Sequence, residues 1–237
     1  MPAPAQLELI YSPGNNYNLR SLDSKEPPQH ARVIRKLSGK VYQARIGLKG
    51  QETNRTVALK IARGQDQVRM LYHEAQVYQG ELKPLQGTVV PKYHGSFMTR
   101  IDGTEVAVMV LEYCGNTPQQ MAMKQIPTVE YTRKLMIAIC KLHQAGVVHG
   151  SIRLDQQHHI LEVGHELRIV DFTNAGRFHT CVGGTPVLVR GGRHDQGCAE
   201  LVMMEEEFGA SENEDAVAVV DQSRQTWRRA FANRLPW

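Results

Sequence analysis

Four side chains spread along the chain could serve a site for phosphate and metal. Lys60 ends an apolar, strand-like run, and a compact charge on a flexible stem suits a phosphate group. Glu74 follows within a helical stretch, and Asp171 comes directly after two apolar residues, where a carboxylate could hold a divalent cation. Ser151 follows a His-Gly pair, but a serine hydroxyl is a very poor base near neutral pH.

The composition is that of a globular protein. Of 237 residues, 41% are hydrophobic and 22% are charged, which is enough to bury one or two cores. The formal net charge is +4, and because no run of Lys and Arg dominates any stretch, we expect no nucleic-acid-binding surface. The longest wholly apolar run, 106–111, is far too short to cross a bilayer, so we expect no membrane contact.

The cysteines and the first residues bear on the cellular compartment. The four cysteines are scattered and form no C-x-x-C pair, a usage typical of reduced thiols inside the cell. The chain does not open on a charged start followed by an apolar run, so no secretory signal is predicted. We therefore expect an intracellular protein, cytoplasmic or nuclear.

The first half of the chain predicts a sheet with one helix. Residues 1–30 are rich in Pro, Asn and Ser and predict a mobile arm with one docked strand. Asp66 can cap a helix that runs to about residue 82, and Asp102-Gly103 is a hairpin dipeptide. The predicted strands cover 7–11, 33–37, 39–44, 56–61, 93–100 and 105–113.

The second half predicts helices around one hairpin. Thr128 can cap a helix to about residue 145, whose apolar residues recur at helical spacing and make a buried face. Residues 160–163 and 167–170 alternate around a glycine-containing turn and predict the hairpin. Weaker patterns predict helices over 198–208 and 216–229.

The order of the motifs resembles that of the protein kinases. Residues 57–60 read Val-Ala-Leu-Lys, and Glu74 follows on the next helix. Residues 149–151 then read His-Gly-Ser, and residues 170–172 read Val-Asp-Phe. By this resemblance the chain is identified as a degenerate, pseudokinase-like member of the protein-kinase-like superfamily. The resemblance implies an α+β, two-lobed protein-kinase-like fold with a reduced C-lobe.

Three regions follow from that resemblance. Residues 1–30 would be a mobile arm, 31–113 an N-lobe with a five-stranded sheet and one helix, and 114–237 a shortened, mainly helical C-lobe. The C-lobe is expected to be short because no A-P-E motif follows Asp171, and the segment that starts the family's central C-lobe helix is missing as well.

The resemblance also implies a site for ATP and Mg²⁺. Lys60 would contact the phosphates while paired with Glu74, so these two side chains should lie within salt-bridge reach. Asp171 would hold the metal, with Gln156 or His159 in place of the family's metal-binding asparagine. The residues assigned to the nucleotide are Gly39, Val41, Ala58, Lys60, Glu74, Glu112, Cys114 and Asp171.

Departures from the family pattern weaken the implied chemistry. Gly39 is the one glycine left of the phosphate loop, and one glycine makes a poor cradle for phosphate. Ser151 replaces the catalytic aspartate, and Arg153 could offer a positive charge to a γ-phosphate. The four histidines between residues 149 and 165 match no zinc-binding spacing, so we expect no zinc there.

The expected function is that of a pseudokinase, a binding or regulatory module with weak or no ATP binding and a protein partner of unknown identity. One alternative is an atypical active protein kinase or a small-molecule phosphotransferase that uses ATP, because phosphoryl transfer depends largely on positioning and electrostatics. Another is a degenerate fragment that binds no ligand and serves as an interaction surface. Titration with nucleotide separates this last alternative from the other two.

Overall fold

The computed structural model describes residues 5–23, 29–48, 51, 55–115, 129–152, 159–164, 166–181 and 198–208. The chain divides into two compact units. The barrel unit comprises Met1–Cys114 and Asp171–Thr173. The helical unit comprises Gly115–Val170 and Asn174–Trp237.

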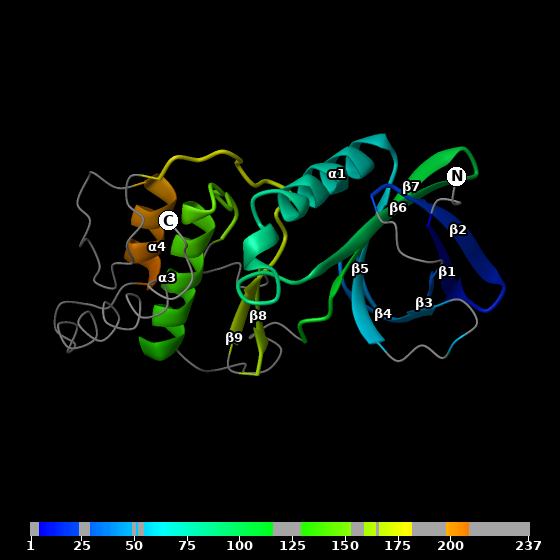
Figure 1. Ribbon diagram of the computed structural model, residues 1–237, viewed down its shortest axis with the longest axis horizontal. Helices are drawn as coiled ribbons and strands as arrows, with labels where there is room; N and C mark the ends of the chain where they lie inside the picture. Colours follow the sequence, from blue (N-terminus) through cyan, green and yellow to red (C-terminus); the bar gives the residue numbers. More distant parts are fainter. Residues whose placement is uncertain are drawn as a thin grey trace. The chain divides into compact units, whose positions relative to one another are not determined.

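Seven strands of the barrel unit form a closed β-barrel (Figure 1). Neighbouring strands follow the order β1-β2-β6-β7-β5-β4-β3. Strand β1 closes the ring by pairing in parallel with β3, and the other neighbours are antiparallel. The strands are β1 (Gln6–Ser12), β2 (Asn15–Ser21), β3 (Gln29–Ser38), β4 (Val41–Leu48), β5 (Arg55–Arg63), β6 (Tyr93–Ile101) and β7 (Thr104–Glu112).

The barrel has an apolar interior because successive side chains of a strand point to opposite faces. On β5, Val57 and Leu59 are fully buried in the core. Ala58 and Lys60 alternate with them along the strand and therefore lie on the outer face. Closure of the ring leaves no long unpaired edge. The buried core residues are Leu7, Leu9, Leu19, Ala31, Ala44, Ile46, Val57, Leu59, Phe97, Val108 and Val110.

Helix α1 (Gln65–Gln79) packs on the outside of the barrel against β5, β6 and β7. It begins after Gly64, whose φ of 86° lies in the left-handed region that favours glycine. Its buried residues are apolar or aromatic apart from Glu74. The short 3-10 helix η1 (Lys83–Leu85) follows. The predicted helix is therefore confirmed, and it places one buried carboxylate against the strands.

The helical unit contains helix α3 (Val129–Gln144), the hairpin of β8 (Ile160–Val163) and β9 (Glu166–Ile169), and helix α4 (Ala199–Phe208). Helix α3 packs against α4 and β9. Its predicted buried face is confirmed, since Leu135, Met136, Ile139, Cys140 and Leu142 are all inaccessible to solvent. A bilayer crossing needs a longer and more apolar helix than any in the described residues. The helix predicted over 216–229 lies outside the described residues.

The predicted two-lobed, kinase-like fold is wrong. The sheet is a closed seven-stranded barrel instead of a five-stranded lobe, and the described part of the chain has only three α-helices. The physical reason lies in residues 6–21, where an arm with one strand was predicted. These residues form two strands that bury Leu7, Leu9 and Leu19 and join β3 to β6. The structure therefore does not support the resemblance to protein kinases.

Candidate ligand-binding site

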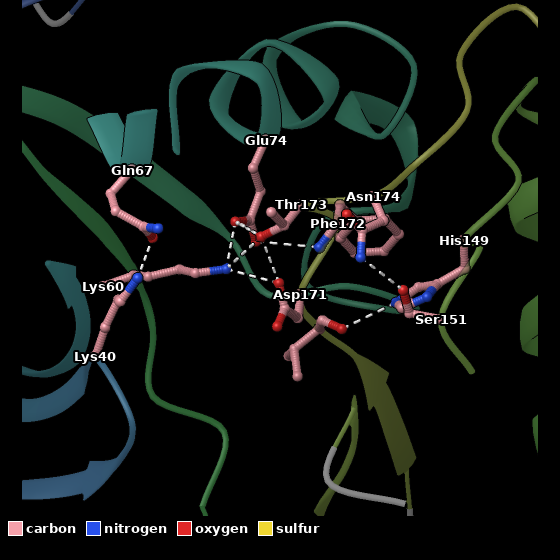
Figure 2. A network of polar contacts seen from close by, with 11 residues as sticks. Lys40, Lys60, Gln67, Glu74, His149, Ser151, Asp171, Phe172, Thr173 and Asn174 are labelled. Atoms are coloured by element: carbon pink, nitrogen blue, oxygen red, sulfur yellow. Dashed lines mark hydrogen bonds and ion pairs between the residues drawn. The ribbon is translucent and has the colours of Figure 1, made fainter. Parts of the chain in front are cut away.

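Lys60 is the centre of a polar network on the outer face of the barrel (Figure 2). Its ammonium nitrogen lies 2.5 Å from Glu74 Oε2 and 2.7 Å from Asp171 Oδ1. It also donates to Thr173 Oγ1 at 2.9 Å. The predicted Lys60–Glu74 ion pair is thus present, and a strand, a helix and the segment after β9 all contribute to it.

Glu74 organises the network because both of its carboxylate oxygens accept hydrogen bonds. Oε1 accepts from the backbone N–H of Phe172 at 3.1 Å, and Oε2 lies 3.1 Å from Thr173 Oγ1 as well as near Lys60. The residue is 1% exposed, so the carboxylate is held by contacts rather than by water. Glu74 therefore fixes both the direction of Lys60 and the course of residues 171–173.

Asp171 is held in a strained backbone conformation beside the lysine. Its φ is 69°, in the left-handed region that is costly for a residue with a side chain. The next residue, Phe172, is fully buried and meets Tyr78 edge-on at 5.5 Å between ring centroids. The Asp171 side chain is nevertheless 42% exposed. Packing of Phe172 thus holds a carboxylate that a cation from solvent can reach.

The charges of the network shift the pKa of its members. Burial would lower the pKa of Lys60, but the carboxylates of Glu74 and Asp171 outweigh it and raise that pKa. Burial raises the pKa of Glu74, and the Asp171 charge adds to this while Lys60 opposes it. Two carboxylates face one ammonium, so the site has an excess of negative charge that would favour a further cation.

The predicted phosphate loop is a tight turn. Ser38 pairs with Val41 across the β3–β4 hairpin, which leaves Gly39 and Lys40 as the two turn residues. Gly39 has a φ of 39°, and Val41 lies opposite Lys60 in the β4–β5 register. The Lys40 ammonium bonds to the Gln67 side chain. A two-residue turn offers few backbone N–H groups, so it cannot enclose a chain of phosphates.

The residues predicted to meet adenine lie on neighbouring strands. Ala58 pairs with Leu111 between β5 and β7. The Glu112 backbone N–H donates to Lys92 O at 2.8 Å, and its carboxylate accepts from the Lys92 N–H at 3.0 Å. Cys114 is buried, with Sγ 3.5 Å from Glu112 O. Glu112 is therefore committed to the end of the strand, and its N–H is not available to a ligand.

The loop that begins at His149, the predicted counterpart of the kinase catalytic loop, belongs to the helical unit. Ser151 Oγ accepts a hydrogen bond from Asn174 Nδ2 at 3.1 Å. His149 is buried, with Nε2 3.0 Å from Val170 O. His159 is also buried, its ring 5.5 Å from that of His149. Arg153 and Gln156, the other predicted residues of this loop, lie outside the described residues.

Glu200 is a second buried carboxylate that the sequence did not single out. It lies 2.6 Å from His143 Nε2 and accepts the backbone N–H groups of His149 at 3.0 Å and Gly150 at 2.6 Å. Burial would raise its pKa, but the hydrogen bonds from His143 and the two N–H groups outweigh burial and lower it. Glu200 therefore anchors the 149–150 loop to the start of α4.

A cluster of histidines and cysteines adjoins Glu200. Its members are His143, His179, Cys181 and Cys198. These residues are scattered between positions 143 and 198 and match no local metal-binding motif, so no local pattern predicted the cluster. Thr173 stands two residues after Asp171, but its contact with Lys60 was not predicted.

No protein-family model matches the chain, and no curated protein shows significant sequence similarity to it. The function must be argued from the site alone.

Proposed function

We propose that the barrel unit binds the phosphate groups of a nucleotide, with ATP and Mg²⁺ as the first ligand to test. The chain would act as a binding or regulatory module with weak affinity and no phosphoryl transfer. One observation carries the proposal: a buried Glu74 orients Lys60 while the exposed Asp171 carboxylate contacts the same ammonium. This arrangement combines a phosphate-binding cation with a metal-binding anion.

Charge compensation explains how the network would accept such a ligand. Lys60 is shared between two carboxylates, and Mg²⁺ prefers to bind through one or two carboxylates together with phosphate oxygens. A cation on Asp171 would neutralise that carboxylate and weaken its attraction for Lys60. The lysine could then contact a phosphate while remaining paired with Glu74. Binding of nucleotide should therefore depend on the divalent cation.

Two features favour weak binding without catalysis. The tight turn at Gly39 cannot supply the backbone cradle that tightly bound phosphates need. Ser151 is the residue that the sequence offered in place of a base, and its hydroxyl accepts a hydrogen bond from Asn174. A serine hydroxyl is a poor proton acceptor near neutral pH. Both features support a binding role over a catalytic one.

Thermal-shift titration with ATP, with and without Mg²⁺, tests the proposal. A specific ligand raises the unfolding midpoint as its concentration increases. We expect a rise at millimolar ATP that requires Mg²⁺ and is lost in Lys60→Met and in Asp171→Asn. Lys83→Met is the matched control, because this exposed lysine lies on η1 and should retain the rise. A midpoint unchanged by ATP and Mg²⁺ would contradict the proposal and favour a module without a nucleotide.

Phosphoryl transfer remains the second candidate, because the Lys60–Glu74–Asp171 network would also suit a reaction that relies on positioning. Assays of ATP hydrolysis and of transfer to proteins and small molecules separate the two. We expect no turnover above that of the Asp171→Asn variant. Robust turnover that Asp171→Asn abolishes would replace the binding module with a phosphotransferase.

A further inference from the structure

Four potential metal ligands converge within the helical unit. His143 comes from the last turn of α3, His179 and Cys181 from the segment after β9, and Cys198 from the residue before α4. One ligand atom from each lies within 4.8 Å of all the others. Three separate segments thus bring two imidazoles and two thiols to one point.

The spacing of these atoms fits a tetrahedral ion. Zinc bonds of about 2.1 Å to nitrogen and 2.3 Å to sulfur place neighbouring ligand atoms about 3.3–3.8 Å apart. The distance from His143 Nδ1 to Cys198 Sγ is 3.5 Å. Since no pair exceeds 4.8 Å, each pair would need to close by about 1.5 Å at most. Side-chain rotation can supply such a change without moving the helices.

Glu200 prepares His143 to bind a metal. The Glu200 carboxylate lies 2.6 Å from His143 Nε2, and a carboxylate accepts, so Nε2 carries the proton. In the neutral imidazole Nδ1 then keeps its lone pair, and Nδ1 is the atom that faces Cys198. Histidine ligands of metals commonly donate their other N–H to a carboxylate, which orients the ring and raises its basicity. The His143 side chain is 0% exposed, so this orientation is fixed by packing.

The imidazole of His179 is a second, independent observation at the cluster. Its Nε2 is buried and has no hydrogen-bond partner among the described residues, although buried polar atoms are almost always bonded. Its backbone N–H donates to Gly146 O at 2.8 Å, and its ring meets that of His143 edge-on at 5.1 Å. The backbone contact and the ring contact therefore hold the imidazole beside His143, and among the described residues its Nε2 has no hydrogen-bond partner.

We propose that His143, His179, Cys181 and Cys198 form a structural Zn²⁺ site. Two thiolates and two imidazoles suit zinc, and four protein ligands leave no open position for a substrate. The ion would join the end of α3 to the start of α4. Through Glu200 it would also steady the loop at His149 and Gly150. This site is separate in residues and in chemistry from the proposed nucleotide site.

Metal analysis of the full chain, purified under reducing conditions without added metal, tests the proposal. We expect about one zinc per chain, and after removal by a chelator we expect Zn²⁺ and Co²⁺ to rebind. Bound Co²⁺ should give the absorption of a tetrahedral site with thiolate ligands. Cys181→Ser and Cys198→Ser should each weaken Zn²⁺ affinity by more than roughly 100-fold, because loss of a ligand should exceed loss of an outer-shell partner.

Cys140→Ala and Glu200→Gln make the test specific. Cys140 is buried on α3 but lies outside the cluster, so its variant should keep full zinc content. Glu200→Gln should weaken Zn²⁺ affinity by roughly 10–100-fold while preserving the tetrahedral Co²⁺ spectrum, which a merely unfolded variant would lose. A folded native chain that binds neither ion would overturn the proposal. Equal loss of zinc in Cys140→Ala, or a Cys181–Cys198 disulfide in place of the metal, would also overturn it.

Discussion

Each unit contains a buried glutamate that accepts backbone N–H groups from a distant loop, and the two have different partners. These residues are Glu74 in the barrel unit and Glu200 in the helical unit. Glu74 is paired with a lysine, and a second carboxylate, Asp171, lies on the same ammonium. Glu200 is paired with a histidine whose other nitrogen faces a thiol.

The two glutamates have pKa values shifted in opposite directions because their surroundings differ. Glu74 has a raised pKa because it is deeply buried and near the charge of Asp171. Glu200 has a lowered pKa because its hydrogen bonds from His143 and two N–H groups outweigh burial. Burial is the largest influence on both pKa values, and the balance of hydrogen-bond donors and neighbouring charges sets the direction of each shift. Glu74 positions the Lys60 ammonium, and Glu200 positions the His143 imidazole.

Replacing Glu74 should give the largest loss of stability. Glu74→Ala leaves Lys60 with one partner fewer and the Phe172 N–H unsatisfied, and breaking a buried pair costs about 3–5 kcal/mol. Urea unfolding followed by circular dichroism measures the free energy. Asp66→Asn is the control, because this carboxylate is 89% exposed and its loss should cost under about 1 kcal/mol. Equal stability of the two variants would show that Glu74 does not organise its unit.

If the proposed zinc is bound, its removal should destabilise the helical unit and leave the barrel unit nearly unchanged. A ligand at 100 times its Kd stabilises by about 2.7 kcal/mol, equivalent to about 100-fold in hydrogen exchange. Chelation should therefore accelerate exchange in α3 and α4 by roughly that factor, with β5 and β7 nearly unchanged. Exchange measured by mass spectrometry on the full chain checks this. Equal acceleration in the barrel strands would contradict the assignment of the metal to the helical unit.

Replacing a glycine by alanine should cost more stability in the Gly150 loop of the helical unit than in the Gly39 turn of the barrel unit. Gly150 has a φ of 75°, and an added Cβ would lie 2.9 Å from Asn174 O, a backbone atom that cannot yield easily. Gly39 has a φ of 39° with open space around it. We expect Gly150→Ala to cost about 2–3 kcal/mol and Gly39→Ala about 1 kcal/mol, since only the first adds a collision to the strain. Urea unfolding would contradict this if the order were reversed.

The smallest expected effect concerns two stacked tyrosines of the barrel unit. The ring centroids of Tyr78 and Tyr93 lie 6.0 Å apart. The Tyr78 hydroxyl is buried and has no hydrogen-bond partner among the described residues. The Tyr93 hydroxyl bonds to Asp23 and to Ser96. Tyr78→Phe should stabilise by up to about 1 kcal/mol, and Tyr93→Phe should destabilise by about 1 kcal/mol. Loss of stability in Tyr78→Phe would reveal a partner for that hydroxyl.

The sequence predicted those elements whose signals are local. Helix α3 carries a clear apolar face, and Asp102-Gly103 marks the β6–β7 hairpin. Closure of the barrel was not predicted because β2 buries a single residue, Leu19, and so lacks an alternating apolar pattern. Without that strand, the order of the remaining elements suggested an open sheet and, with it, the kinase-like fold.

The Lys60 network and the His–Cys cluster also differ in how far the sequence could predict them. Lys60 and Glu74 lie on a strand and the helix that directly follows, so their pairing could be predicted from their order along the chain. The His–Cys cluster includes His143 and Cys198, which lie 55 residues apart in the sequence. No local spacing encodes that meeting, because it depends on how α3 packs against α4.

The ladder between β2 and β6 is the shortest in the barrel. Two residue pairs join these strands, Arg20 with Met98 and Ser21 with Phe97, whereas β5 and β7 are joined along nearly their whole length. Contacts between segments so distant in sequence form slowly, because the intervening chain must first be brought together. Asp23 reinforces this seam by accepting the Ser96 N–H at 3.0 Å. We therefore expect β2 to pair with β6 last during folding and to separate from it first during unfolding. The hydrogen bond between Asp23 and Ser96 should slow that separation.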